Sequence, residues 1–109
     1  MQIKVPRKYF QLTVENTEEI LRKYIKPNYD INYSIRQSEQ SRSIYVTINK
    51  GGCNIQKVIR LSDHPGKYLK YHYISKRTRY HKIVGIFINA IHSIDRKNLN
   101  KLMEDVLQC

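Results

Sequence analysis

The sequence predicts an α+β fold: a short N-terminal helix, an antiparallel sheet of three or four strands, and two C-terminal helices packed on one face. Apolar residues recur with a period near 3.6 at both ends of the chain and with a period of two in its middle. Turn sequences separate the middle segments. The length of 109 residues suits one domain, residues 1–109, with one core between helices and sheet.

The first helix is expected to begin at Asn16, whose side chain can cap it, with Glu19 at the capping-box position. Pro27 is expected to end it, because proline cannot continue a helix. The apolar stripe between them consists of Ile20, Leu21, Tyr24 and Ile25.

From Asp30 onward, apolar and polar residues alternate, which is typical of half-buried strands. Strands are expected over residues 31–36, 44–48 and 55–61, because these segments are rich in β-branched and aromatic residues. Turns are expected at residues 49–52 and 63–66. Residues 68–74 fit either a fourth strand or an ordered loop.

Two helices are expected in the last third of the chain, over residues 83–94 and 99–107, the second capped by Ser93 or Asp95. Residues 83–88 alone also fit a strand, but Ile91 and Ile94 continue the helical stripe. The apolar side of the last helix could pack on its own domain or on a second copy, so a homodimer through this helix is left open. That side carries Leu102, Met103, Val106 and Leu107.

The charge balance predicts a polyanionic partner. Twenty Lys and Arg stand against nine Asp and Glu, for a net charge of +11, and such self-repulsion is relieved by a negatively charged target. Nucleic acid is the commonest such target; an anionic membrane surface or an acidic protein is the alternative. No apolar run approaches the roughly 20 residues that span a bilayer, and no signal peptide opens the chain. We therefore expect a cytoplasmic protein with free thiols at Cys53 and Cys109.

Residues 64–94 contain no acid and interleave Lys and Arg with Tyr, a mixture that suits RNA or single-stranded DNA. The alternative is that the lysines only solvate a sheet face while the tyrosines pack with their hydroxyls outward. Ile35-Arg36 and Ile59-Arg60 each end a strand, which would place both arginines on neighbouring strands as one basic edge. The candidate binding residues are Arg36, Arg42, Arg60, Lys67, Lys70, Tyr71, Tyr73, Lys76, Arg77, Arg79, Tyr80 and Lys82.

An enzymatic function is not expected. The spacing of the histidines matches no ligand pattern for a metal, such as a pair at i, i+4 on a helix. Ser62 or Cys53 with His64 could form a nucleophile–base pair, but no nucleophile elbow surrounds them. The sequence therefore predicts no catalytic residue, metal or cofactor, and His64 is expected to hydrogen-bond its own turn. The histidines are His64, His72, His81 and His92.

Two short motifs carry a resemblance. Residues 60–64, Arg-Leu-Ser-Asp-His, resemble a strand end found in small proteins of bacteriophages and other mobile elements, and residues 41–45, Ser-Arg-Ser-Ile-Tyr, resemble the start of the preceding strand there. This group includes an anti-CRISPR inhibitor of type II RNA-guided nucleases. The resemblance covers residues 33–107 and implies an anti-defence protein in a bacterial cytoplasm, binding a CRISPR ribonucleoprotein. It brings no catalytic residues; a general DNA- or RNA-binding module is the alternative.

Overall fold

The computed structural model describes residues 4–39, 42–52, 54–64 and 71–107. The expectations for Cys53, Cys109, Lys67 and Lys70 lie outside these ranges. The elements in chain order are helix α1 (Val14–Ile20), its π-helical continuation η1 (Leu21–Ile25), strands β1 (Ile31–Ser38), β2 (Ser43–Lys50), β3 (Gln56–Ser62) and β4 (His72–Tyr73), and helix α2 (Tyr80–Leu107).

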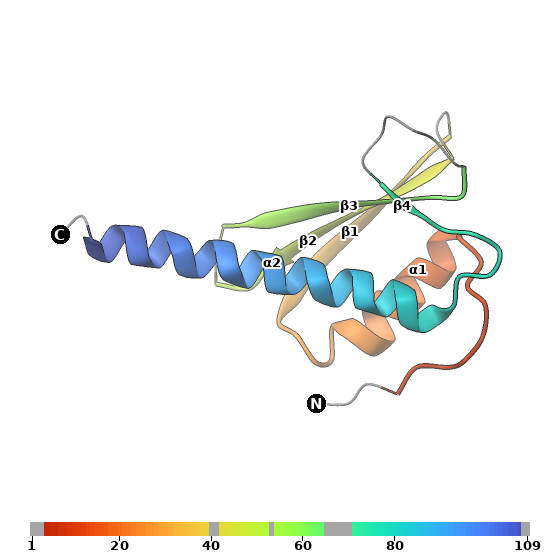
Figure 1. Cartoon of the computed structure of the whole chain (residues 1–109), viewed down its shortest axis with the longest axis horizontal. Helices are drawn as coiled ribbons and strands as arrows, with labels where there is room; N and C mark the ends of the chain where they lie inside the picture. The colour runs from red at the N-terminus through yellow and green to blue at the C-terminus, as the bar shows by residue number, and fades with distance from the viewer. Residues whose placement is uncertain (1–3, 40–41, 53, 65–70, 108–109) are drawn as a thin grey trace.

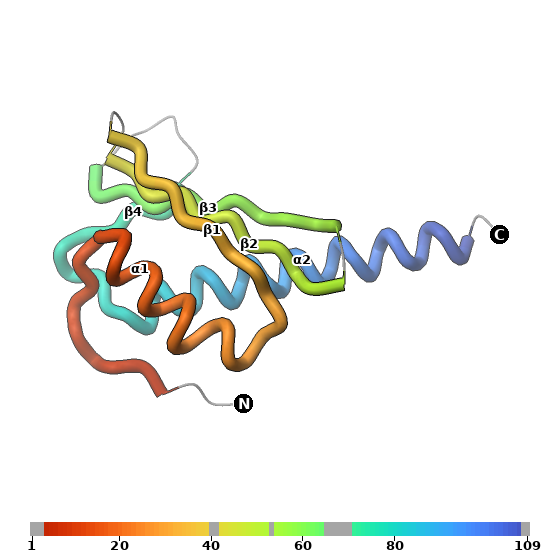
Figure 2. Tube along the Cα trace, turned by 180° about the vertical axis from the view of Figure 1, so that it is seen from behind, coloured from red at the N-terminus to blue at the C-terminus, as the bar shows by residue number. Residues whose placement is uncertain are grey.

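The elements form two layers, a sheet in the order β1-β2-β3-β4 and the helices α1 and α2 on one of its faces (Figures 1 and 2). The opposite face of the sheet carries no helix in the described part of the chain, and we call it the open face. The core lies between the layers, where Val46 and Ile48 of β2 and Phe87 and Ile91 of α2 are all fully buried. The predicted α+β class and the packing of helices on one face are confirmed.

The three long strands are explained by the alternation of inward-facing and outward-facing side chains along the sequence. In β2, Ile44, Val46 and Ile48 are buried against the helices, whereas Tyr45 and Thr47 are only partly covered on the open face. Every second residue from Ile44 to Ile48 is apolar and buried, and this fixes the register, because a slip of one residue would turn all of these side chains to solvent. Strand β2 pairs antiparallel with both β1 and β3, as predicted.

The N-terminal helix begins earlier than predicted. Thr13, not Asn16, is its N-cap: the Thr13 Oγ1 accepts a hydrogen bond of 3.0 Å from the backbone N–H of Asn16. The Asn16 side chain instead donates to the carbonyl of Gln11 at 2.9 Å. Threonine and asparagine both favour N-caps, so the residue types alone did not show which of Thr13 and Asn16 caps the helix. The helix ends at Ile25, before Pro27, as predicted.

The prediction of two C-terminal helices is wrong, because α2 is one helix of 28 residues that already begins at Tyr80. Neither Gly nor Pro stands between Ile94 and Leu99, so the polar residues there cost the helix little. Asp95 does not cap a new helix; its carboxylate lies 3.1 Å from the Nζ of Lys50 on the sheet. Residues 83–88 are helical, as the stripe through Ile94 indicated.

The end of α2 projects beyond the strands (Figures 1 and 2). Its last buried residue is Ile94, and the apolar side chains beyond it are more than half exposed. At about 100° per residue, these side chains are centred roughly 120° around the helix from the stripe that packs on the sheet. Homodimerisation through this helix stays a prediction. The exposed side chains are Leu99, Leu102, Met103, Val106 and Leu107.

A fourth strand exists but is short, and the prediction of a fully antiparallel sheet is wrong. β4 pairs with the end of β3 in the parallel direction, Leu61 with His72 and Ser62 with Tyr73. The connection between Ser62 and His72 is longer than a hairpin turn, which allows the chain to return in the same direction. On the side away from β2, the rest of β3 therefore has no strand beside it among the described residues. No described helix is long and apolar enough to cross a membrane.

Candidate nucleic-acid interface

A row of arginine and tyrosine side chains crosses the open face. Arg36 of β1, Tyr45 of β2 and Arg60 of β3 lie directly opposite one another in the register of the sheet. The guanidinium carbons of Arg36 and Arg60 are 4.5 Å and 5.5 Å from the centre of the Tyr45 ring. Arg60 also lies 5.2 Å from the ring centre of Tyr71, just before β4. The four side chains form one alternating row, which we call the Arg–Tyr row.

Contacts within the sheet hold this row in place. The Nε of Arg60 donates a hydrogen bond of 2.9 Å to the Oγ of Ser43, and the hydroxyl of Tyr71 donates to the carbonyl of His64. Each guanidinium within about 6 Å of a tyrosine ring is attracted by the ring's quadrupole. The row is thus preorganised, and a base stacking on it would immobilise few additional side-chain rotamers.

Apart from Val58, the other residues of β1, β2 and β3 on the open face are polar, and none is an acid. Side chains alternate along each strand, so those in phase with Arg36, Tyr45 and Arg60 share its face. None of them in β1, β2 or β3 is Asp or Glu, so the strands place no like charge in the way of a phosphate. They are Asn32, Ser34, Ser38, Ser43, Thr47, Asn49, Gln56, Val58 and Ser62.

A groove of about 750 Å³ runs between the free edge of β3 and helix α2. Arg60 and Tyr71 line it as well as belonging to the Arg–Tyr row, so the groove continues from the open face. Lys57, His72 and Arg96 add cationic or titratable groups from β3, β4 and α2, and no Asp or Glu is among the lining residues. The other residues that line it are Val58, Ile59, Ile86, Asn89, Ala90 and Ser93.

The electrostatics of the groove act on His72. Its pKa is lowered from the usual value, first because burial disfavours the charged imidazolium and then because Lys82 and Lys57 repel it. Lys82 thus joins the same positive region from the first turn of α2. Cations from β3 and α2 thus lie around the imidazole of β4 in this groove.

Three of the predicted site residues meet in this interface: Arg36, Arg60 and Tyr71. The expectation that the two arginines lie on neighbouring strands is wrong, because β2 lies between β1 and β3. Tyr45 of that central strand connects them, so they form a row and not a sheet edge. Tyr73, 46% exposed, lies beside Ser62 at the end of the same face, and Lys82 lies near the groove.

Other predicted residues lie elsewhere. Tyr80 is only 3% exposed and packs edge-on against Phe10 with ring centres 5.3 Å apart. Its assignment to a binding surface is corrected, because a buried ring cannot stack on a base. Arg79 lies 5.3 Å from the ring centre of Tyr9, in the loop before α2. Arg42, in the turn before β2, is 3.8 Å from the carboxylate of Asp63.

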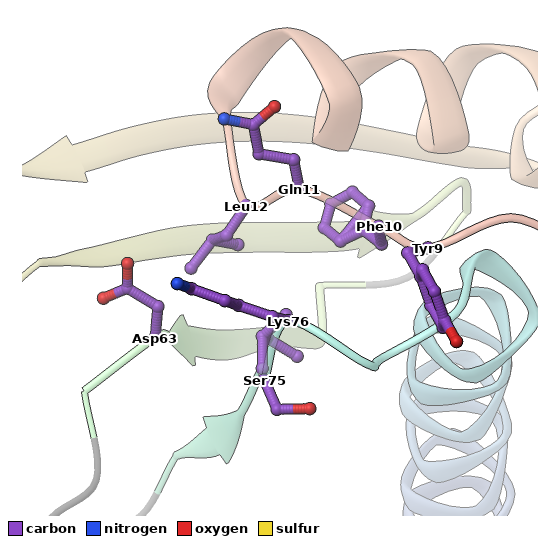
Figure 3. Close-up of a pocket in the computed structure, with 8 residues that line it drawn as sticks. Tyr9, Phe10, Gln11, Leu12, Asp63, Ser75 and Lys76 are labelled. Atoms are coloured by element: carbon purple, nitrogen blue, oxygen red, sulfur yellow. The ribbon is translucent and has the colours of Figure 1, made fainter.

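Lys76 belongs to a different pocket, of about 430 Å³, between the N-terminal segment and the loop before α2 (Figure 3). Its side chain points toward Asp63 across the pocket, beside Leu12. Arg77 follows it in the same loop, where its backbone N–H donates to the Oγ of Ser75. A pocket that combines one cation with one carboxylate suits a polyanion less than the acid-free groove does.

Sequence reasoning missed Tyr45, Lys57, His72 and Arg96. A signal for Tyr45 was present, since it alternates with the buried Ile44 and Val46 and must face the other side of the sheet. The groove residues gave no such signal, because they come from three elements whose approach depends on the long α2 and the parallel β4.

The two motifs at residues 41–45 and 60–64 contact each other. Besides the bond between Arg60 and Ser43, the Oγ of Ser62 donates to the carbonyl of Arg42 at 3.3 Å and accepts from the backbone N–H of His64 at 3.3 Å. Ser43 and Ser62 are both buried. These residues therefore fix the conformation where β3 ends and β2 begins, and they hold Arg60 in position.

Comparison with known proteins gives no family: no protein-family model, no curated protein and no solved structure matches this chain.

Proposed function

We propose that the protein binds single-stranded nucleic acid, RNA or DNA, on the open face of its sheet, without catalysing a reaction. The observation that carries the proposal is the Arg–Tyr row of Arg36, Tyr45, Arg60 and Tyr71. Aromatic rings and guanidinium planes on a protein surface are the groups on which unpaired bases stack.

Charge and shape favour this ligand over the other polyanions. Neither the strands' open face nor the groove carries an acid, which suits a phosphate backbone. A membrane surface would call for apolar side chains to insert, but the row consists of arginines and tyrosines. A duplex keeps its bases stacked inside, so their faces are out of reach of the row.

The salt dependence of binding tests the size of the electrostatic contribution. The cations of the row and the groove are Arg36, Arg60, Lys57 and Arg96, and Lys82 lies near the groove as a fifth. If each of the five meets one phosphate, the slope of log K against log salt is about −3.5, at roughly −0.7 per contact on single strands. Fluorescence anisotropy with a poly-uridine oligonucleotide of about ten nucleotides measures it. A slope near zero would remove the electrostatic part of the proposal.

A second candidate function is inhibition of a type II CRISPR ribonucleoprotein, as an anti-defence protein of a phage or mobile element. The observation that favours it is that both motifs of the resemblance meet at Arg60 and Ser43, in the interface itself. A basic protein would hold the guide RNA or an acidic patch of the nuclease; with its charge of +11 it is no acidic mimic of DNA.

A cleavage assay separates the two candidates. Type II nucleases loaded with guide RNA are given target DNA with and without the purified protein. Lost cleavage at protein concentrations that leave free oligonucleotide unbound would favour the inhibitor. Unchanged cleavage across several type II enzymes, together with binding to free oligonucleotide, would leave the general nucleic-acid-binding function alone.

A further inference from the structure

The groove between β3 and α2 has a chemistry distinct from that of the open face. The row offers ring and guanidinium surfaces, whereas the groove offers Lys57, Arg96 and His72 around a hollow of about 750 Å³. The two share Arg60 and Tyr71. A ligand that stacks on the row thus has a continuous path into the groove.

We propose that this groove holds the phosphodiester backbone of the strand whose bases stack on the Arg–Tyr row. The inference rests on the proposed function and assigns the two parts of the ligand to two surfaces. A polynucleotide carries bases on one side and phosphates on the other, and the sheet and the groove present stacking groups and cations in the same side-by-side arrangement.

The backbone of β3 contributes to the groove. β4 pairs only with Leu61 and Ser62, so among the described residues no strand pairs with the outer side of residues 56–60, where the groove lies. A free edge presents backbone N–H and C=O groups, and the N–H groups can donate to phosphate oxygens as side chains do. Arg60 connects both surfaces, since it lies between the rings of Tyr45 and Tyr71 and also lines the groove.

His72 makes the phosphate site sensitive to pH. Lys57 of β3 and Lys82 of α2 face it and disfavour its protonation in the free protein. A phosphate in the groove neutralises these charges and favours the imidazolium. Binding therefore takes up a proton, and affinity rises as pH falls toward the lowered pKa of His72, by at most about tenfold per pH unit for one proton.

The test compares two double variants that remove the same charge. The first double variant, Lys57→Gln with Arg96→Gln, removes two cations from the groove. The second, Lys97→Gln with Lys101→Gln, removes two exposed cations from α2 outside the groove. With the uridine oligonucleotide, the first pair is expected to make the salt slope less negative by about 1.4, from roughly −0.7 per contact. The second pair is expected to leave it unchanged. An oligonucleotide with neutral methylphosphonate linkages, which carries no phosphate charge, should bind the two double variants with equal affinity.

The pH arm uses His72→Gln, with His92→Gln, outside the groove, as its control. Between about pH 8 and about pH 5.5, affinity should rise more in the wild type and the control than in His72→Gln. If the groove pair behaves like the Lys97–Lys101 pair and His72→Gln keeps the full pH response, the phosphate site is refuted. Should Tyr45→Ala still weaken binding in that case, the open face remains the interface; if it does not, the proposed function fails as well.

Discussion

Replacing Tyr45 by alanine is expected to weaken the binding of single-stranded nucleic acid by about 1–3 kcal/mol, the range found for loss of one base-stacking ring. This corresponds to roughly 5- to 150-fold in Kd. The effect should be large because Tyr45 lies at the centre of the row, between Arg36 and Arg60. Anisotropy titrations of wild type and variant, at one salt concentration, measure it.

Two controls make this result specific. Tyr45→Phe keeps the ring and should bind within about twofold of the wild type, because stacking does not need the hydroxyl. Tyr9→Ala removes a 59% exposed tyrosine that also packs with an arginine, Arg79, but outside the sheet. Equal losses in Tyr9→Ala and Tyr45→Ala would mean that the open face holds no privileged site.

Replacing Phe87 by alanine is expected to lower the free energy of unfolding by about 3–5 kcal/mol, the usual cost of emptying a buried aromatic site. Phe87 is fully buried on the face of α2 that packs on the sheet. A domain of this size has only about 5–15 kcal/mol of stability, so the variant should unfold at far lower denaturant. Urea denaturation followed by circular dichroism measures it.

Leu102→Ala is the matched control on the same helix. Leu102 is 54% exposed beyond the end of the sheet, so its truncation should change the unfolding free energy by about 0.5 kcal/mol or less. If Leu102→Ala were as costly as Phe87→Ala, and more so at higher protein concentration, the projecting helix would be buried against a second copy.

Periodicity predicted the elements well wherever one face of an element is buried and the opposite face is not. Ile44, Val46 and Ile48 alternate in β2 and are all buried, so this strand was found close to its true bounds. The single C-terminal helix was missed because residues 95–98 are polar, and a polar stretch reads as a break. In the structure this stretch lies where the helix leaves the sheet, with Asp95 paired to Lys50 at the boundary. Polar residues there mark the end of the core, not of the helix.

The site was only partly predictable for a related reason. Arg36 and Arg60 stood out as matching strand ends, but their true relation required the strand order, in which Tyr45 lies between them. Charge density alone favoured residues 76–82, and the structure divides these among a pocket with Asp63, a buried ring and the first turn of α2. Charge predicts that a partner is anionic, whereas the fold decides which cations reach it together.

The most direct test of the open face is an NMR titration of the isotope-labelled protein with the uridine oligonucleotide. We expect the largest shift changes at the ring signals of Tyr45 and Tyr71 and at the side-chain Nε of Arg36 and Arg60. Signals of Leu102 and Val106, on the projecting end of α2, should not move. Saturating binding that leaves the two tyrosine rings unshifted, or that perturbs only the helical layer, would contradict the account.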